Sequence, residues 1–443
     1  MIHFINIQFD DFKEDGWSFV SRKLKRLLFL PFDLLLIVIA FPLFLLIRLL
    51  RPLVIVRIFS VNIGRIGGIY QGEWYLSEKA AGLHCGRYFD FFYFDKETSH
   101  VNLQWKRMWK RALPYMPGID LWKKILTINR LIPGYEKHDR TGFQHCFPDL
   151  KIWQAHQKNP LDGKLDVINK RLELVLKNKK PNISMSLEEE RACTVLDDLG
   201  IDKEKQYICF HARDSAYLNK IHKKIDWSYH DYRDSSIQNY VPMAEEMANR
   251  GYYAIRVGAV VKDQIHSSNP KVIDYAISKS RTDFNDIYLG SHCRFMVCSD
   301  GGISVIPEML RIPAVYVNWT LLLRISTWVL NGLFIFKKFY LKNENRFMMF
   351  SEMLELDFGD KDTNRIFADL KLELVENTPE EIQAVTIEMD ERLNGKWETT
   401  KDDEELQKHF WDLFGPDKLR SPDLRIGTEY LRENKNLLVY TPN

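Results

Sequence analysis

Three side chains able to bind an anion or move a proton follow one apolar run of the chain. Segment 205–214 has the pattern of a buried strand, and His211, Arg213 and Asp214 lie at its end. A guanidinium can hold a diphosphate through two parallel hydrogen bonds, and a carboxylate can orient the arginine or accept a hydroxyl proton. We predict a diphosphate site at Arg213, with Asp214 and His211 as candidate bases. The alternative is a solvated strand end with a local ion pair.

A second candidate site follows the strand pattern at 294–299, where two glycines precede a helix pattern. Its residues are Ser299, Asp300, Gly301 and Gly302. Glycines there would open a helix N-terminus whose backbone N–H groups can bind an anion. Glu308 lies two turns further on, and we predict that it reaches a sugar hydroxyl. Arg256 and Gly258 end a neighbouring strand pattern and are predicted to face the same cleft. The alternative is an ordinary strand-to-helix turn.

A third candidate is the glycine-rich turn after the strand pattern at 53–61. Its residues are Asn62, Gly64, Arg65 and Gly67. Glycines let a backbone approach a ligand closely, and the helix pattern that follows favours an anion at its start. Because the spacing differs from the G-x-G-x-x-G of dinucleotide sites, we predict a loop that contacts an acceptor substrate. The alternative is a tight strand-to-helix turn.

Alternating strand and helix patterns must position these candidates. Continuous β-branched runs such as 53–61 suit strands buried in a parallel sheet, and their alternation with helix patterns predicts an α/β fold. Ligands of parallel sheets bind beyond the carboxyl ends of the strands, which is where the three candidates lie. A linker-like stretch at 180–184 separates two such arrays. We therefore predict two Rossmann-like domains.

Residues 27–50 form the most apolar stretch of the chain, and Asp33 and Arg48 are its only charges. The length suffices to cross a bilayer core, which takes about 20 apolar residues. Basic residues flank both ends, which favours the cytoplasmic side for both, and Pro31 and Pro42 would each kink or break a helix. Three interpretations stay open: a kinked span, a re-entrant hairpin from the cytoplasmic face, which we favour slightly, and a buried core helix.

We divide the chain into four parts on these patterns. Residues 1–52 form a membrane-associated segment, 53–180 an acceptor domain, and 181–360 a donor-binding domain. Residues 361–443 are predicted to be helical and to pack back on the first domain. The run 327–340 is apolar and then basic, which is typical of a core strand or of a second membrane-contacting patch.

The composition excludes several classes of protein. The chain has 443 residues, with 62 Lys and Arg against 60 Asp and Glu, and a net charge of +2 argues against a dedicated nucleic-acid binder. Its six cysteines include no C-x-x-C pair, which excludes a disulfide scaffold. A mean hydropathy of -0.29 excludes a polytopic membrane protein. No Asp-x-Asp motif follows a suitable strand pattern, and we expect neither a metal nor a cofactor.

Seven segments, in this order, resemble a family of membrane-associated bacterial glycosyltransferases of surface-polysaccharide biosynthesis. They are HARDSAYLN (211–219), YRDSSIQNYVPMAEEMANRGYYAIRVG (232–258), NPKVIDYA (269–276), RTDFNDIYL (281–289), SDGGISVIPEMLRIPAVYVN (299–318), FKKFYLK (336–342) and RIGTEYLRENKNLL (425–438). The His-x-Arg element is also similar to the one with which fucosyltransferase-like enzymes of GT-B fold contact the donor's β-phosphate, and this role carries over to Arg213. Those enzymes have an acid three residues after the arginine, where this chain has Ala216, so a GDP-fucose donor does not follow.

The resemblance implies a GT-B-like glycosyltransferase of hexosyltransferase type that works without a metal. It would move a sugar from a nucleotide-sugar donor to a lipid-linked or polysaccharide acceptor in surface glycan or lipopolysaccharide synthesis. It would do so at the cytoplasmic face of the bacterial inner membrane, with no nucleic-acid partner. Two alternatives remain: a nucleotide-sugar epimerase of similar fold, and a non-catalytic, membrane-tethered glycan-assembly protein.

Overall fold

The computed structural model describes residues 2–63, 66–82, 84, 86–94, 102–141, 172–185, 194–221, 226–356, 363–415 and 420–438. The chain divides into two compact units. Unit 1 is Met1–Val61, His84–Lys96 and Pro114–Gly142; unit 2 is Asn62–Leu83, Glu97–Leu113 and Phe143–Asn443. Each unit contains a parallel sheet together with helices, which confirms the predicted α/β fold.

Unit 1 is built on a three-stranded parallel sheet in the order β2-β1-β3. Its strands are β1 (Ile55–Val61), β2 (Tyr88–Phe94) and β3 (Asp139–Arg140). Helices α1 (Ile2–Leu49) and α4 (Ile119–Asn129) pack on one another and on this sheet. The core they share consists of Ala40, Phe44, Val56, Ile58, Phe91, Tyr93, Ile125 and Leu126. The last part of α1 is therefore part of the hydrophobic core of unit 1.

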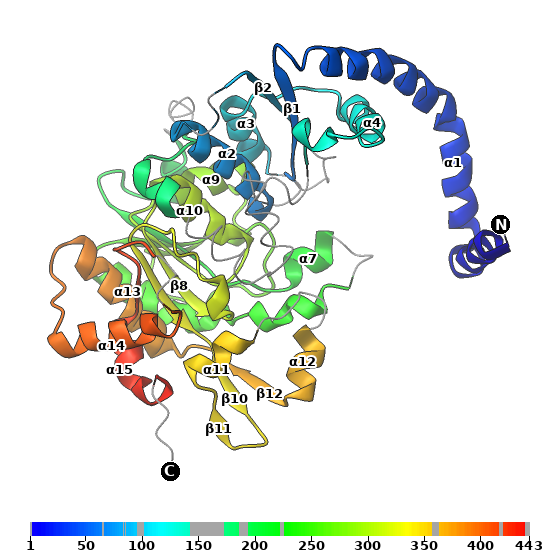
Figure 1. Cartoon of the computed structure of the whole chain (residues 1–443). Coiled ribbons are helices and arrows are strands. Elements are labelled where there is room, and N and C mark those ends of the chain that lie inside the picture. The colour runs from blue at the N-terminus through cyan, green and yellow to red at the C-terminus, as the bar shows by residue number, and fades with distance from the viewer. Residues whose placement is uncertain are drawn as a thin grey trace. The chain divides into compact units, whose positions relative to one another are not determined.

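Helix α1 contains nearly all of the apolar segment 27–50. It continues through Pro31 and Pro42, and Figure 1 shows it as one strongly bent helix. Residues Leu28–Leu49 are long and apolar enough to cross a bilayer by length and composition, with a mean hydropathy of 2.7. A continuous helix does not reverse its direction, so α1 does not take the form of the re-entrant hairpin that we favoured.

Unit 2 contains a seven-stranded parallel sheet in the order β13-β9-β8-β7-β4-β5-β6. Its strands are β4 (Tyr207–His211), β5 (Tyr253–Arg256), β6 (Val272–Asp274), β7 (Met296–Cys298), β8 (Ala314–Trp319), β9 (Gly332–Phe336) and β13 (Arg425–Ile426). The chain starts at β4, adds β5 and β6 on one side, and then returns to β7 and continues on the other side. This is the order 3-2-1-4-5-6 of doubly wound sheets with one strand added. The order reverses between β4 and β7, and ligands of such sheets bind at that point.

Helices and a small antiparallel sheet make up the rest of the described part of unit 2, and Figure 1 labels most of them. The helices are α2 (Tyr70–Ala80), α3 (Leu103–Ala112), α7 (Ala216–Ile221), α8 (Val241–Asn249), α9 (Asp283–His292), α10 (Val305–Leu310), α11 (Phe350–Glu355), α12 (Thr363–Asp369), α13 (Pro379–Leu393), α14 (Lys401–Asp412) and α15 (Thr428–Glu433). A small antiparallel sheet has the order β11-β10-β12 and consists of β10 (Lys338–Leu341), β11 (Arg346–Phe347) and β12 (Leu372–Val375). The run 327–340 supplies β9, whose residues are all buried, so it forms a core strand and not a second membrane patch.

The C-terminal helices find the partner for their apolar faces in unit 2. Phe410 of α14 stacks on Phe336 at the end of β9, with ring centroids 5.6 Å apart. Tyr430 of α15 donates a hydrogen bond from its hydroxyl to the carbonyl oxygen of Phe336 at 3.1 Å. The described part of residues 361–443, for which we predicted packing on the first domain, thus contributes side chains to the core around β9.

Helices α2 and α3 also belong to unit 2, although the predicted acceptor domain 53–180 includes them. Glu73 of α2 forms a buried ion pair with Arg311, which directly follows α10. The Asn102 side chain, which caps α3, donates to the carbonyl oxygen of Asp283 at 3.0 Å. These buried polar contacts explain the grouping. The sequence patterns of residues 162–180 and 186–200 also predict helices, but more than half of each segment lies outside the described residues.

Candidate functional site

The two predicted anion sites on the large sheet meet at its switch point. The backbone N–H of Arg213, beyond the end of β4, donates to Ser299 Oγ at 2.7 Å. The N–H of Ser299, at the end of β7, donates to the carbonyl oxygen of His211 at 3.2 Å. Gly301 lies against the arginine, because a Cβ atom added there would be 3.5 Å from Arg213 Cβ. Segments 211–214 and 299–302 are therefore neighbours and form one candidate site.

Arg213 is a buried cation whose hydrogen-bonding capacity is only partly used. Its side chain forms an ion pair with Asp234 through Nη1, while Nη2 has no hydrogen-bond partner among the described residues. Burial, together with the smaller effect of the neighbouring charge of Arg233, lowers the pKa of Arg213 to about 10. A buried donor without a partner costs about 1–3 kcal/mol, and more when it is charged. This nitrogen is therefore suited to an anionic ligand.

Two further cations, which the sequence analysis missed, lie in the same cluster. Lys337 directly follows β9 and is 3% exposed, and its Nζ donates to the carbonyl oxygens of Tyr232 (3.2 Å) and Asp234. Arg233 ends the short helical turn Ser228–Arg233, and its Nη1 lies 3.8 Å from Asp300 Oδ1. Both residues fall within segments that carry the family resemblance. Lys337 could have been predicted in the same way as the other site residues, because it is a polar residue that directly follows a strand.

The charges of this cluster influence one another. Burial lowers the pKa of Lys337 to about 8; the positive charge of Arg213 acts in the same direction, and the carboxylates of Glu376 and Asp300 act against it. Asp300 also accepts a hydrogen bond from Thr320 Oγ1 at 2.9 Å. The carboxyl ends of β4, β7, β8 and β9 thus supply Arg213, Asp300, Thr320 and Lys337, respectively. A ligand phosphate there would meet several cations without leaving the sheet edge.

The candidate bases His211 and Asp214 lie at the end of β4. His211 Nδ1 bonds to the carbonyl oxygen of Val257 at 2.9 Å, and since a carbonyl only accepts, Nδ1 carries the proton and Nε2 the lone pair. Burial lowers the pKa of His211 to about 4, so the ring is neutral at pH 7. Asp214 accepts from the backbone N–H groups of Ala216 and Lys262, both at 2.9 Å. Both side chains have an atom that can accept a proton, but the Asp214 carboxylate also connects the backbone at Ala216 to the backbone at Lys262 through these hydrogen bonds.

Two predicted site residues, one at the end of β5 and one just after it, have different surroundings. Arg256 is 1% exposed, and its Nη1 lies 3.2 Å from Asp274 Oδ2 on the neighbouring β6. Its guanidinium thus has a half-buried carboxylate partner through Nη1, while Nε and Nη2 have no hydrogen-bond partner among the described residues. The predicted role of Arg256 toward a ligand stays a prediction. Gly258, in contrast, lies beside the candidate base: a Cβ atom added there would be 3.5 Å from His211 Nδ1.

Glu308 of α10 also has protein partners for both carboxylate oxygens. Ser326 Oγ donates to Oε1 at 3.0 Å and Trp328 Nε1 donates to Oε2 at 3.2 Å. The side chain is 3% exposed. Each carboxylate oxygen could accept one further hydrogen bond, and the predicted contact of Glu308 with a sugar remains a prediction.

The glycine-rich turn after β1 lies partly beside the switch point. Gly67 belongs to the short helical turn Ile66–Ile69, and a Cβ atom added there would be 3.7 Å from Gly302 Cα. Asn62 is exposed at the end of β1. Gly64 and Arg65 lie outside the described residues. The predicted acceptor loop thus reaches the glycine segment of the site through Gly67.

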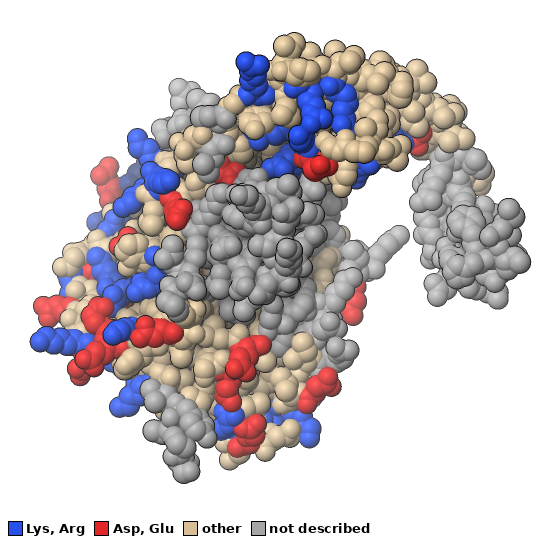
Figure 2. Space-filling model, viewed as in Figure 1, with Lys and Arg blue, Asp and Glu red and all other residues tan. Residues whose placement is uncertain are grey.

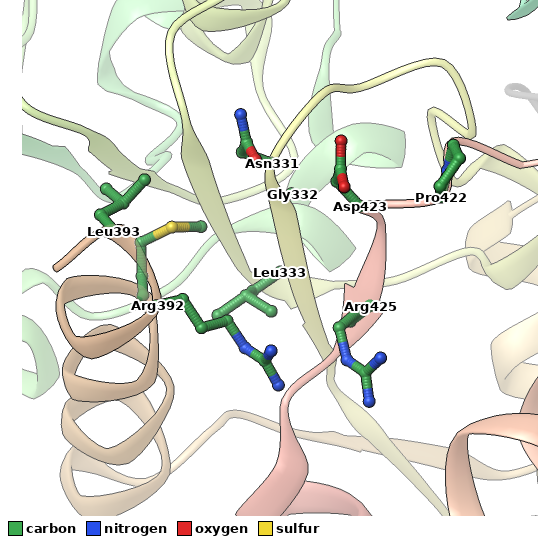
Figure 3. Close-up of a pocket in the computed structure, with 9 residues that line it drawn as sticks. Asn331, Gly332, Leu333, Arg392, Leu393, Pro422, Asp423 and Arg425 are labelled. Atoms are coloured by element: carbon green, nitrogen blue, oxygen red, sulfur yellow. The ribbon is translucent and has the colours of Figure 1, made fainter. Parts of the chain in front are cut away.

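A shallow pocket elsewhere in unit 2 lies at the opposite ends of the strands. It encloses about 260 Å³, and Figure 3 shows Arg392 and Arg425 on one side of it and Asp423 on another. Gly332 and Arg425, which begin β9 and β13, line it. Both arginines are already paired, Arg392 with Glu388 and Arg425 with Glu404. Because parallel sheets bind ligands at the carboxyl ends of their strands, the switch point is the better candidate.

No group of three or more His, Cys, Asp and Glu side chains that could hold a metal ion occurs in the part of the chain that the structure describes. The predicted absence of a metal therefore stays a prediction.

Comparison with known proteins shows remote likenesses only. No protein-family profile and no curated protein matches the chain. Among solved structures it is similar to Escherichia coli ADP-heptose lps heptosyltransferase II, with 11% identity over 71% of this chain and 98% of that one, and a TM-score of 0.37. It is also similar to a glycosyl transferase family 9 protein from Veillonella parvula DSM 2008, with 10% identity over 77% and 98% and a TM-score of 0.44.

A third similar structure is the UDP-GlcNAc 2-epimerase from Neisseria meningitidis bound to UDP-GlcNAc. Its identity is 12% over 59% of this chain and 82% of that one, with a TM-score of 0.28. Likenesses this remote carry no functional argument, so a proposal for this chain depends on its own residues.

Proposed function

We propose that this chain is a glycosyltransferase that takes a sugar from a nucleotide-sugar donor. The observation that carries the proposal is the buried Arg213 at the switch point of a doubly wound sheet, with Nη2 unpartnered among the described residues. Lys337 and Arg233 add positive charge around the same place. A diphosphate offers the oxyanions that such a cluster binds, and nucleotide sugars carry their sugar on a diphosphate.

In the proposed reaction an acceptor hydroxyl oxygen attacks the anomeric carbon of the donor sugar. The bond from that carbon to the diphosphate oxygen breaks, and the nucleoside diphosphate leaves with the electron pair. Arg213 and Lys337 stabilise the negative charge that develops on it. The hydroxyl proton passes to a base, for which His211 Nε2 and Asp214 are the candidates. Protein cations perform the charge stabilisation, and we propose that no metal or cofactor is required.

The acceptor and the setting are proposed on the sequence of α1 and on the family resemblance. An apolar helix of this length suits a lipid-linked or polysaccharide acceptor, which is made where nucleotide sugars meet the membrane. We place the enzyme at the cytoplasmic face of a bacterial inner membrane, in surface glycan or lipopolysaccharide synthesis. The transferred group is proposed to be a hexose or a related sugar, with Asn62–Gly67 on the acceptor side.

Calorimetric titration of the full chain in mild detergent with UDP, GDP and ADP and their sugar conjugates tests the proposal. At least one of them should bind, and Arg213→Ala should weaken it by about 10- to 100-fold, the equivalent of one charged hydrogen-bond pair. Arg346→Ala is the matched control, because Arg346 is an exposed arginine of the small sheet.

Three outcomes would contradict the proposal. Binding of no nucleotide would favour a non-catalytic assembly protein. Equal affinity of the native chain and the Arg213 variant would remove the proposed site. Conversion of the donor sugar without transfer to an acceptor would favour an epimerase.

A further inference from the structure

Two faces of helix α1 have different surroundings, and both faces are mainly apolar. One stripe along the helix is buried or half-buried in unit 1 and repeats every three or four residues, as one face of a helix does. The stripe consists of Asp33, Leu36, Ala40, Leu43, Phe44, Ile47 and Arg48. The opposite face is exposed and almost entirely apolar, with Val38 69% exposed and Phe41 51% exposed. Only one face of this helix therefore remains for a membrane.

The buried stripe is fastened at both ends to the rest of unit 1. Asp33 forms an ion pair with Lys124 of α4 at 3.0 Å. Fifteen residues later, Arg48 Nε donates to Asn129 Oδ1 at 2.8 Å, and its guanidinium also donates to the carbonyl oxygen of Ile132 at 3.1 Å. Between these two points, Ala40 and Phe44 are buried beneath α4 and the sheet. The helix from Asp33 to Arg48 is thus one body with α4.

Because residues 33–48 are attached to α4, the rest of α1 has too few apolar residues to cross a bilayer. Residues 33–48 cover about 22 Å at 1.5 Å per residue, and moving them through the bilayer core would carry Lys123, Lys124 and the sheet with them. Before Asp33, the uninterrupted apolar run is limited to residues 27–32, because basic residues occupy positions 22, 23, 25 and 26. Six residues extend about 9 Å, whereas a hydrocarbon core is about 30 Å thick.

We propose that α1 is a monotopic membrane element, which enters one leaflet with its exposed face and leaves both chain termini on the same side of the bilayer. This proposal adds detail to the membrane association proposed above, because it states that α1 lies in one leaflet and does not span the bilayer. It does not depend on the proposed sugar transfer.

The charge around the helix fits a leaflet with anionic headgroups. Figure 2 shows the described part of α1 as an arch of mostly uncharged side chains, with Lys and Arg gathered where the arch meets the rest of unit 1. Arg51, Lys123 and Lys137 are exposed there. Leu49 and Leu131 are 75% and 80% exposed beside them. Apolar side chains rimmed by basic ones are the pattern of interfacial helices that bind anionic lipid.

The topology is tested with the full chain carrying different epitope tags at its two ends, expressed in bacterial cells. Inside-out and right-side-out membrane vesicles are treated with a protease that does not cross membranes. Both tags should be cleaved in inside-out vesicles and protected in right-side-out vesicles. Cleavage of the N-terminal tag in right-side-out vesicles would show a span and overturn the proposal.

Binding is tested by sedimentation of the purified chain with vesicles of phosphatidylethanolamine and phosphatidylglycerol, and with vesicles of phosphatidylcholine alone. The native chain should prefer the anionic vesicles, and Val38→Glu should weaken binding by about tenfold or more. Leu370→Glu is the control, because Leu370 is a part-exposed leucine of unit 2 and should change nothing. Equal binding of Val38→Glu and the native chain would overturn the assignment of the lipid-facing side. Nucleotide affinity, measured separately, reports on the proposed function alone.

Discussion

At the scale of single residues, the candidate site is a cluster of cationic side chains whose pKa values differ. Arg213 remains charged at any ordinary pH because its pKa, although lowered by burial, is about 10. Lys337 is different, because burial lowers its pKa to about 8. A ligand that binds near both should therefore respond to pH through the lysine and not through the arginine.

Nucleotide affinity should fall as the pH rises through 8. A bound diphosphate favours protonated Lys337, and at a pKa of about 8 the protonated fraction falls about tenfold between pH 7 and pH 9. The affinity of the native chain should fall by up to that factor, and Lys337→Arg should remove the fall because arginine stays protonated. Calorimetry at several pH values measures both.

Lys338→Arg is the control for this experiment. Lys338 is the next residue, and its Nζ pairs with Glu381 Oε1 at 2.8 Å, so this variant should keep the native pH dependence. A pH profile of Lys337→Arg identical to the native one would show that Lys337 does not contact the nucleotide.

At the scale of elements, α1 combines a role in the core of unit 1 with a face that the core does not use. Phe44 is 2% exposed and Phe41, three residues earlier, is 51% exposed. The two rings lie on one helix, with centroids 6.3 Å apart. The same substitution at the two positions should therefore separate folding from membrane binding.

Phe44→Ala should lower the free energy of unfolding by about 3–5 kcal/mol, the usual cost of removing a buried phenylalanine. Phe41→Ala should change it by about 0.5 kcal/mol or less but weaken vesicle binding. Urea unfolding in mild detergent and vesicle sedimentation measure the two effects. Equal destabilisation by both variants would argue against the buried stripe on α1.

At the scale of the whole molecule, the near-zero net charge is an average over unlike regions. Exposed basic residues lie beside α1 in unit 1, and cations gather at the switch point in unit 2. Figure 2 shows acidic and basic side chains intermixed over the region that carries α13 and α14. The net charge of +2 therefore does not reveal these local clusters of positive charge.

Removing the N-terminal segment should have an effect that depends on where the cut falls. A chain that lacks residues 1–27 keeps Ala40 and Phe44 in the core of unit 1 and should fold. A chain that lacks residues 1–49 exposes the sheet face that Ala40 and Phe44 cover. The backbone amides of unit 1 should then lose their protection from hydrogen exchange. Hydrogen exchange of the β1 and β2 amides measures this. Protected amides in the shorter chain would show that α1 is dispensable for the core.

Much of the site was predictable because short-range patterns reveal where strands end. The apolar runs before His211 and Ser299 predicted strands, and the polar residues after them follow from the chemistry of parallel sheets. Lys337 was missed because the run before it could be a strand or a membrane patch. Arg233 was missed because it follows no strand, and only folding of the turn 228–233 brings it to Asp300.

The sequence by itself determined the α/β alternation, the apolar character of residues 27–50 and the strand-end positions of His211, Arg213 and Ser299. These depend on periodicity and residue type, which are local properties. Tertiary structure alone decided that β4 and β7 are neighbours, that Glu308 and Arg256 are buried and pair with other side chains of the protein, and that one stripe of α1 belongs to the core. Those outcomes depend on contacts between residues distant in the chain, and residue spacing along a single sequence carries no record of them.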